Sequence, residues 1–150
     1  MEERIHVDCG PAALAVVDAV AFVADERAGG IAVFAGTTRR YTDDLETVEL
    51  KYEAFEQMAV SEMRKLAVAA VEEYSLVKAY VAHRVGRVAF GETSVLIAVS
   101  SAHRDEAFKA CRVLIDQVKT QVPIWKKEVY ADGSEEWVKG SVPVLRGRKS

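Results

Sequence analysis

The segment from Ser100 to Glu128 constrains the fold of this chain more than any other stretch. Its apolar residues recur at steps of three and four, the pattern of a helix with one buried face. These residues are Phe108, Cys111, Ile115, Val118 and Val122. Ser100 or Ser101 suits the N-cap, and Pro123 forces the residue before it out of helical geometry. The pattern therefore predicts a helix from Ala102 to Gln121.

Cationic residues gather at both ends of this helix. His103 and Arg104 stand at its start, where free N–H groups already favour anions, so the pair indicates a phosphate or carboxylate site. A solvated arginine beside a capping histidine accounts for the same pair. Lys119 lies on the border between the apolar and polar faces, where a lysine often only extends its stem to solvent. The segment after the helix adds Lys126 and Lys127.

Composition limits the class of protein. The 150 residues are 50% apolar and 29% charged, which describes one soluble domain with a real core. The net charge of −3, without a basic stripe, argues against nucleic-acid binding. No apolar run approaches the roughly 20 residues of a membrane helix, and the start lacks a signal peptide's regions, so we expect no membrane and a cytoplasmic location. Residues 1–140 are predicted to form the domain and 141–150 a loose basic tail.

The first part of the chain predicts two strands around a helix. Ile5–Val7 resembles a short strand, and Ile31–Ala35 is apolar at every position, which indicates a strand covered on both faces. Between them Pro11 opens a helix that ends before Gly29 and Gly30. Its shared face is expected to hold Leu14, Val17, Ala21 and Ala24.

The loop after the second strand contains Gly36, Thr37, Thr38, Arg39 and Arg40. A glycine followed by hydroxyls and arginines at the end of a buried strand can cradle an anion. A plain surface loop is the alternative.

A second group of elements follows. Val48, Leu50 and Tyr52 alternate with charged residues, as in a half-exposed strand. A long helix from Phe55 to Tyr74 comes next. Its inward residues are expected to be Met58, Ala59, Met63, Leu66, Ala70 and Val71.

The remaining elements are strands. Lys78–Val85 and Ser94–Val99 are predicted strands, and His83 inside the first is interpreted as a structural histidine. Ile124–Tyr130 and Glu136–Val138 flank the sequence ADGS, which predicts a hairpin turn.

Adjacent strands and irregular alternation with helices favour an α+β sandwich over a doubly wound parallel sheet. The phosphate-loop, zinc-protease and nucleophile-elbow motifs are absent. Cys9 and Cys111 lack metal-ligand spacing, and Cys111 on an apolar helix face is interpreted as a buried structural thiol. We expect no metal site.

Four stretches together are specific enough to indicate a family. The segment SSAHRDEAFKACRVLIDQVKTQVPIWKKE, followed by an acidic-Gly turn and Trp137-Val138, closely resembles the large, catalytic subunit of molybdopterin synthase, the MoaE family. FAGTTR at Phe34–Arg39, LKYEAFEQMA at Leu50–Ala59 and HRVGRVAFGE at His83–Glu92 agree with it.

The resemblance implies a sulfur transferase of molybdenum cofactor synthesis that uses no cofactor of its own. Its substrate would be cyclic pyranopterin monophosphate, which gains two sulfurs to become the dithiolene of molybdopterin. Sulfur would arrive as a thiocarboxylate on the C-terminal Gly-Gly of a small ubiquitin-like partner. The implied fold is an α/β hammerhead, a mostly antiparallel sheet with three main helices, and the implied assembly is a homodimer within a heterotetramer.

The resemblance also implies roles for residues. Lys119 would anchor the thiocarboxylate tail, polarise its acyl carbon or form a transient covalent link, and Lys126 would neutralise phosphate or an oxyanion. Because neighbours in a strand face opposite ways, only one of Lys126 and Lys127 is expected to line the pocket deeply. Phe34 would wall the channel for the partner's tail. The substrate-binding residues would be Arg39, His103, Arg104, Thr37, Thr38, Lys127 and Glu128.

One family position differs, since Ser141 stands where some members carry an arginine, with Lys139 and Arg146 nearby as candidate substitutes. His103 and Lys119 are sixteen positions apart, or about 24 Å along a helix. One small substrate cannot touch both, so a shared pocket would have to combine two subunits. The competing hypotheses are a dimeric module that binds a phosphorylated metabolite without turnover, and a purely structural subunit.

Overall fold

The computed structural model describes residues 1–42 and 45–138. The predicted basic tail, with Ser141 and Arg146, lies outside the described residues, as does Lys139.

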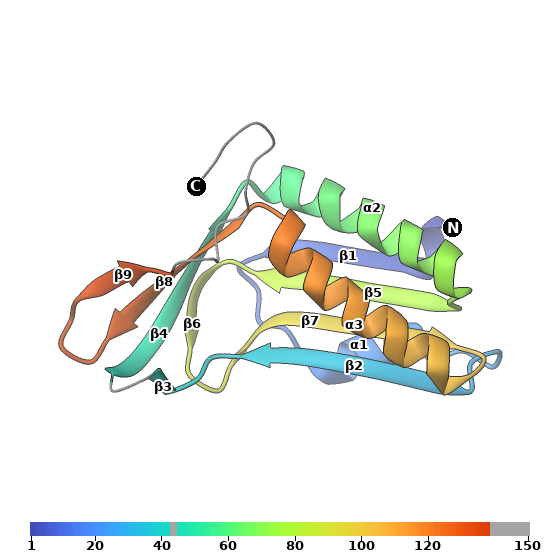
Figure 1. Cartoon of the computed structure of the whole chain (residues 1–150), viewed down its shortest axis with the longest axis horizontal. Helices are drawn as coiled ribbons and strands as arrows, with labels where there is room; N and C mark the ends of the chain where they lie inside the picture. The colour runs from blue at the N-terminus through green and yellow to red at the C-terminus, as the bar shows by residue number, and fades with distance from the viewer. Residues whose placement is uncertain (43–44, 139–150) are drawn as a thin grey trace.

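The described residues form two sheets, the second of which extends from one end of the four-stranded sheet (Figure 1). The four-stranded sheet has the order β1-β5-β7-β2, and only its β1–β5 pair is parallel among the described pairings. These strands are β1 (Ile5–Gly10), β5 (Lys78–Arg84), β7 (Thr93–Ser101) and β2 (Gly30–Thr37). The second sheet holds β3 (Tyr41–Thr42), β4 (Leu45–Ala54), β6 (Gly86–Ala89), β8 (Ile124–Tyr130) and β9 (Glu135–Trp137).

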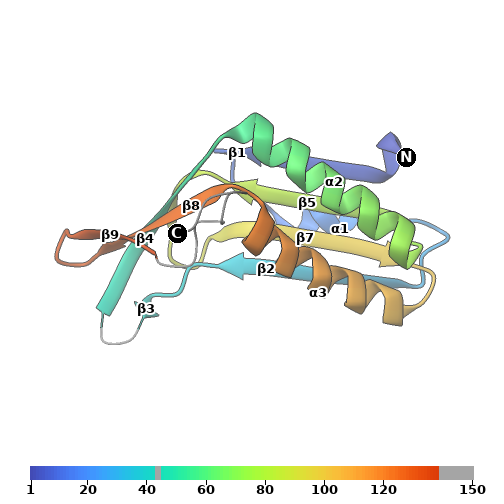
Figure 2. The same cartoon turned by 45° about the horizontal axis from the view of Figure 1, so that its top comes forward.

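Helices cover both faces of the four-stranded sheet. Figures 1 and 2 show α2 (Glu56–Tyr74) and α3 (Arg104–Gln121) on one face and α1 (Val16–Val23) on the other. A 3-10 turn, Glu2–Arg4, precedes β1. The predicted α+β class with a mostly antiparallel sheet and three main helices is confirmed.

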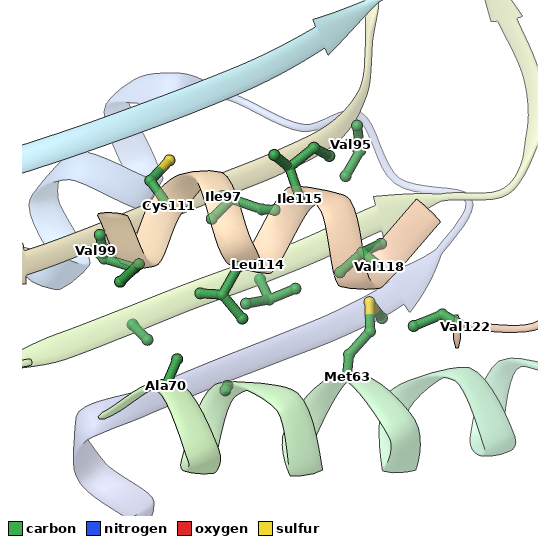
Figure 3. Packing of buried hydrophobic residues seen from close by; sticks show 14 of the residues in the cluster. Met63, Ala70, Val95, Ile97, Val99, Cys111, Leu114, Ile115, Val118 and Val122 are labelled. Carbon is green, nitrogen blue, oxygen red and sulfur yellow. The ribbon is translucent and has the colours of Figure 1, made fainter. Parts of the chain in front are cut away.

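The main core lies between α2, α3 and the sheet. Figure 3 shows Met63 of α2 and Leu114 of α3, both fully buried, in the layer between the two helices and the four-stranded sheet. Small residues on the inner face of α2, such as Ala67 and Ala70, let the two helices approach closely. This packing fixes the direction of α3, so its C-terminal end points toward the second sheet (Figure 1).

The second sheet sets the direction of the lysines after α3. In the β4–β8 pair Tyr52 stands opposite Lys126, and Lys51 stands opposite Lys127. Directly opposed residues share a face of the sheet, so the two lysines project from opposite faces.

The prediction that both faces of the strand at Ile31–Ala35 are covered is wrong. β2 is an edge strand of the four-stranded sheet, and Ile31, Val33 and Phe34 are 42%, 39% and 37% exposed. An apolar run does not tell whether the chain itself covers the strand. This leaves an apolar edge strand at the surface, a feature that natural proteins usually cover or blunt.

Several predicted inward residues are exposed. Phe108 on α3 and Met58 on α2 face solvent, because alanines at Ala107, Ala110 and Ala59 take the inward positions. α3 begins at Arg104, and Ser100 and Ser101 belong to β7, so neither serine is its N-cap. His103 takes that position without a side-chain cap.

The first helix also differs from its prediction. It starts at Val16, not at Pro11, and buries Ala19 and Val23. The expected face is wrong, since Val17, Ala21 and Ala24 are exposed and Leu14 precedes the helix.

In β4 the predicted alternation of buried and exposed residues is wrong at Val48. A register shift between Thr47 and Glu49 leaves Val48 39% exposed, while Thr47, Leu50 and Tyr52 are buried. The strands β3 and β6 were not predicted. Among the described residues, no helix combines the length and apolar character needed to cross a membrane.

Candidate functional site

A cavity of about 560 Å³ lies where the two sheets meet the C-terminal end of α3, a size typical of small-molecule sites. Main-chain segments far apart in sequence supply its walls. They are β2 and its exit loop, β4, β5, the start of β7, the end of α3, β8 and Val138.

Three cations face this cavity from three different elements. Arg39 comes from the loop after β2, Lys119 from the last turn of α3, and Lys126 from β8. A helix C-terminus favours a lysine through its dipole, which suits Lys119. Cations converging on one concave site attract an anion.

Lys126 is the most perturbed of these cations. Burial lowers the pKa of its ammonium below the ordinary lysine value, and the charges of Lys119 and Arg39 lower that pKa further, while Glu128 opposes them. The charges of Lys119 and Arg39 therefore repel the ammonium of Lys126. An anionic occupant would relieve that repulsion.

Glu128 and Phe34 complete the predicted residues in the lining, together with Thr37. Tyr130 donates a hydrogen bond to Glu128 through its hydroxyl, at 2.8 Å. Phe34 is partly exposed at the mouth of the cavity, on the strand that pairs with β7.

The floor of the cavity holds polar residues that were not predicted as site residues. Tyr52 donates to Ser94 Oγ at 3.2 Å, and Ser94 donates to the Gly36 carbonyl at 3.2 Å. His83, predicted to be structural, is buried and packs edge-on against Tyr52 with ring centroids 4.8 Å apart. Its own strand gives no signal of this position, because the contact depends on pairing between distant strands.

Four predicted residues lie outside the lining. His103 and Arg104 are exposed at the far end of α3. Lys127 faces away, 3.8 Å from Glu135 and 4.5 Å from the Trp137 ring centroid. Thr38 is buried beside the cavity loop.

Thr38 acts on the loop through its backbone. Its carbonyl accepts from the Gly91 amide at 3.1 Å, and its amide donates to the Glu92 carbonyl at 3.4 Å. These bonds tie the Arg39 loop to the turn between β6 and β7. Its hydroxyl is buried and has no hydrogen-bond partner among the described residues.

The two cysteine thiols, Cys9 and Cys111, are held in their unreactive protonated form. Burial raises the pKa of both Cys9 and Cys111 to about 11, with Glu56 and Asp8 adding to the effect at Cys9. Both cysteines are free and buried. No group of three or more His, Cys, Asp and Glu side chains within residues 1–42 and 45–138 could hold a metal ion.

Comparison with known proteins places this arrangement in a family. A family model described as MoaE protein matches residues 10–121. A molybdopterin synthase catalytic subunit from Pyrococcus abyssi is 39% identical over 133 residues, covering 87% of this chain and 89% of that protein. One from Arabidopsis thaliana is 47% identical over 126 residues, covering 84% of this chain and 63% of the longer plant protein.

Solved structures agree. The crystal structure of molybdopterin synthase from Staphylococcus aureus superposes with a TM-score of 0.83 at 30% identity, covering 92% of this chain and 98% of that one. A chain from the complex of subunits 1 and 2 of the molybdopterin-converting factor of Helicobacter pylori shares the fold, with a TM-score of 0.71 at 22% identity over 96% of both chains.

Proposed function

Because the chain belongs to the MoaE protein family, we propose that it is the catalytic subunit of a molybdopterin synthase, an enzyme that transfers sulfur in molybdenum cofactor synthesis. Its substrate is cyclic pyranopterin monophosphate, and a small ubiquitin-like subunit delivers sulfur as a C-terminal Gly-Gly thiocarboxylate. The observation that carries this proposal is the convergence of Arg39, Lys119 and Lys126 on one cavity.

We assign a role to each of the three cations from its position and chemistry. Arg39 presents a planar guanidinium, which suits bidentate contact with a phosphate. Lys119 and Lys126 anchor the thiocarboxylate and stabilise the negative oxygen that develops as its carbon–sulfur bond breaks. The inert thiols support this assignment, since the sulfur comes from the partner and not from Cys9 or Cys111.

Phe34 borders the route for the partner's tail. Its ring is 37% exposed at the cavity, and a side chain added at Gly36 would meet that ring at 3.2 Å and Val95 at 2.5 Å. Gly36 therefore leaves room for the Phe34 ring in the cavity wall, and a tail that ends in Gly-Gly would need little space to lie beside this ring.

His103 and Arg104 join the site from a second copy of the chain. The start of β2 lies beside the start of α3, since a side chain at Gly30 would meet Arg104 Cα at 3.1 Å. The other end of β2, at Thr37, lines the cavity. The length of β2, about 23 Å, therefore separates the His103–Arg104 pair from the cavity of the same copy. This length is close to the about 24 Å between His103 and Lys119 along α3.

A two-fold axis near the middle of β2 would bring one copy's Gly30 end beside the other copy's Thr37 end. The exposed apolar residues of β2 support such a homodimer. Ile31 and Val33 lie on an edge strand, and an uncovered apolar edge strand favours association with another chain. The substrate-binding residues then include His103 and Arg104 of the neighbouring subunit. Two small subunits, one for each of the two shared cavities, complete a heterotetramer.

The remaining predicted residues have supporting places in this proposal. Thr37 and Glu128 line the cavity, and Thr38 holds the Arg39 loop through its backbone. Lys127 is assigned to the opposite face of β8. The free thiols fit the reducing cytoplasm, where we place the enzyme.

The experiment mixes the purified chain with a thiocarboxylated small subunit and cyclic pyranopterin monophosphate. Formation of the dithiolene product, dependent on the thiocarboxylate, supports the proposal. The alternative function, a dimeric module that binds a phosphorylated metabolite, predicts binding of the pyranopterin without sulfur transfer.

A further inference from the structure

His83 has an imidazole nitrogen that the mechanism above does not use. The ring lies on β5, lines the cavity and is only 7% exposed. On the neighbouring strands it pairs with Cys9 of β1 and Val95 of β7, so strands on both sides hold its backbone in place. The backbone of His83 is therefore held on both sides, and its ring packs against Tyr52.

One hydrogen bond determines the tautomer of this ring. His83 Nδ1 lies 2.7 Å from the carbonyl oxygen of Arg84. A carbonyl oxygen only accepts, so Nδ1 carries the hydrogen, and in the neutral ring Nε2 carries the free lone pair. No described residue makes a hydrogen bond with Nε2. The cavity wall thus presents an acceptor that residues 1–42 and 45–138 leave unused.

The surroundings keep the ring neutral. The pKa of His83 is lowered to about 4, mainly by burial and also by the charges of Lys119 and Lys126, although the bond to the Arg84 carbonyl opposes this. An imidazolium here would add another positive charge to a cavity already lined by cations. The titratable groups around the ring are Cys9 of β1, Tyr52 of β4, Lys119 of α3, and Lys126 and Glu128 of β8.

A neutral hydrogen-bond acceptor, His83 Nε2, beside cations suits a ligand that carries both an anionic group and a hydrogen-bond donor. The cations take its anionic part, and Nε2 can take only a donor. The proposed substrate has both, since its pterin ring carries N–H groups and the molecule also carries a cyclic phosphate. We propose, on the basis of the function proposed above, that His83 Nε2 accepts a hydrogen bond from a pterin N–H and so selects the ring of the substrate.

Two substitutions separate this role from a structural one. His83→Asn keeps an N–H near the position of Nδ1, and so keeps the bond to the Arg84 carbonyl, but lacks any atom near Nε2. His83→Gln places its carbonyl oxygen near Nε2 and loses the donor at Nδ1. We expect His83→Asn to weaken pyranopterin binding about tenfold, as for one lost hydrogen bond, and His83→Gln to bind within about twofold of wild type.

Inorganic phosphate is the control ligand, because it probes the cations alone. Its dissociation constant, measured by calorimetry, should be the same in all three proteins. A purely structural role predicts the opposite order, with Asn tolerated and Gln impaired. That order, or equal loss of phosphate and pyranopterin affinity in His83→Asn, would overturn the inference.

The pH dependence supplies a second readout. Because Nε2 stays unprotonated down to about pH 4, the ratio of wild-type to His83→Asn affinity should be constant between pH 5.5 and 8. A ratio that collapses as pH falls through 6.5 would show an ordinary titrating imidazole and contradict the inference. If the wild type binds phosphate but no pyranopterin, the proposed function itself fails, and the inference with it. Pyranopterin binding that is equally strong in wild type and His83→Asn would contradict the inference and leave the proposed function intact.

Discussion

Lys119 on α3 and Lys126 on β8 face one cavity so closely that, after burial, the charge of Lys119 is the next cause that lowers the pKa of Lys126. Only a short connection separates their elements, with α3 ending at Gln121 and β8 beginning at Ile124. Folding thus brings together two like charges that repel each other. Such an arrangement costs stability and is found where a site must hold an anion.

Replacing Lys126 by methionine should stabilise the folded protein and abolish sulfur transfer. Folding lowers the pKa of Lys126, so the charged form is penalised at every pH below the lowered value. The gain in melting temperature should therefore be full at pH 7 and should vanish as pH rises through the lowered pKa toward 10.5, where wild-type Lys126 is neutral. Thermal unfolding across this pH range measures it.

Lys127→Met is the matched control, because Lys127 is paired with Glu135 and stacked on Trp137. It should give no stabilisation. An equal gain in both variants would mean that the crowding of cations in the cavity is not the cause.

Arg39→Ala should chiefly weaken substrate binding. The guanidinium faces the cavity and suits the phosphate, so KM should rise about tenfold or more, while kcat changes less. Steady-state kinetics of dithiolene formation measure both constants. Arg40→Ala is the control, since Arg40 pairs with Glu46 and is absent from the cavity lining; an equal rise in KM there would refute the assignment.

Val33→Lys should break the homodimer. Val33 lies near the middle of β2, where the proposed two-fold axis would place two lysines close together. Sedimentation should show a monomer that has lost activity. Val17→Lys, a change at a 72% exposed residue of α1, should remain dimeric. A dimeric, active Val33→Lys protein would place the interface elsewhere.

Mixing subunits tests the shared cavity. Lys119→Ala and His103→Ala should each be inactive alone, because each removes one of the proposed site residues from every site. Random re-association of equal amounts should restore about a quarter of wild-type activity, since half the dimers are mixed and each of these has one complete site. Absence of any recovery, with mixed dimers verified by mass spectrometry, would show that the site is not shared.

The sequence predicted the helical segment and the cations around it, because the signals are local. The periodicity of Cys111, Ile115 and Val118 and the break at Pro123 determine where α3 ends, and so where Lys119 lies. Alternation along β8 separated Lys126 from Lys127 without any knowledge of the partner strand.

The missed features depend on contacts between distant segments. His83 lines the cavity only because β5 pairs with β1 and β7, and Tyr52 of β4 then packs against its ring. The apolar run in β2 was interpreted as buried, although nothing in the run tells a strand buried in its own domain from one facing a neighbour. At Val48 a register shift reversed the expected alternation.

The central claim is that the cavity formed by Arg39, Lys119 and Lys126 transfers sulfur. The most direct measurement compares wild type, Lys119→Ala and Lys109→Ala in dithiolene formation with the thiocarboxylated small subunit. We predict a loss of about a hundredfold or more for Lys119→Ala and wild-type rates for Lys109→Ala, whose lysine pairs with Asp105 away from the cavity. Wild-type turnover by a folded Lys119→Ala protein would contradict the account.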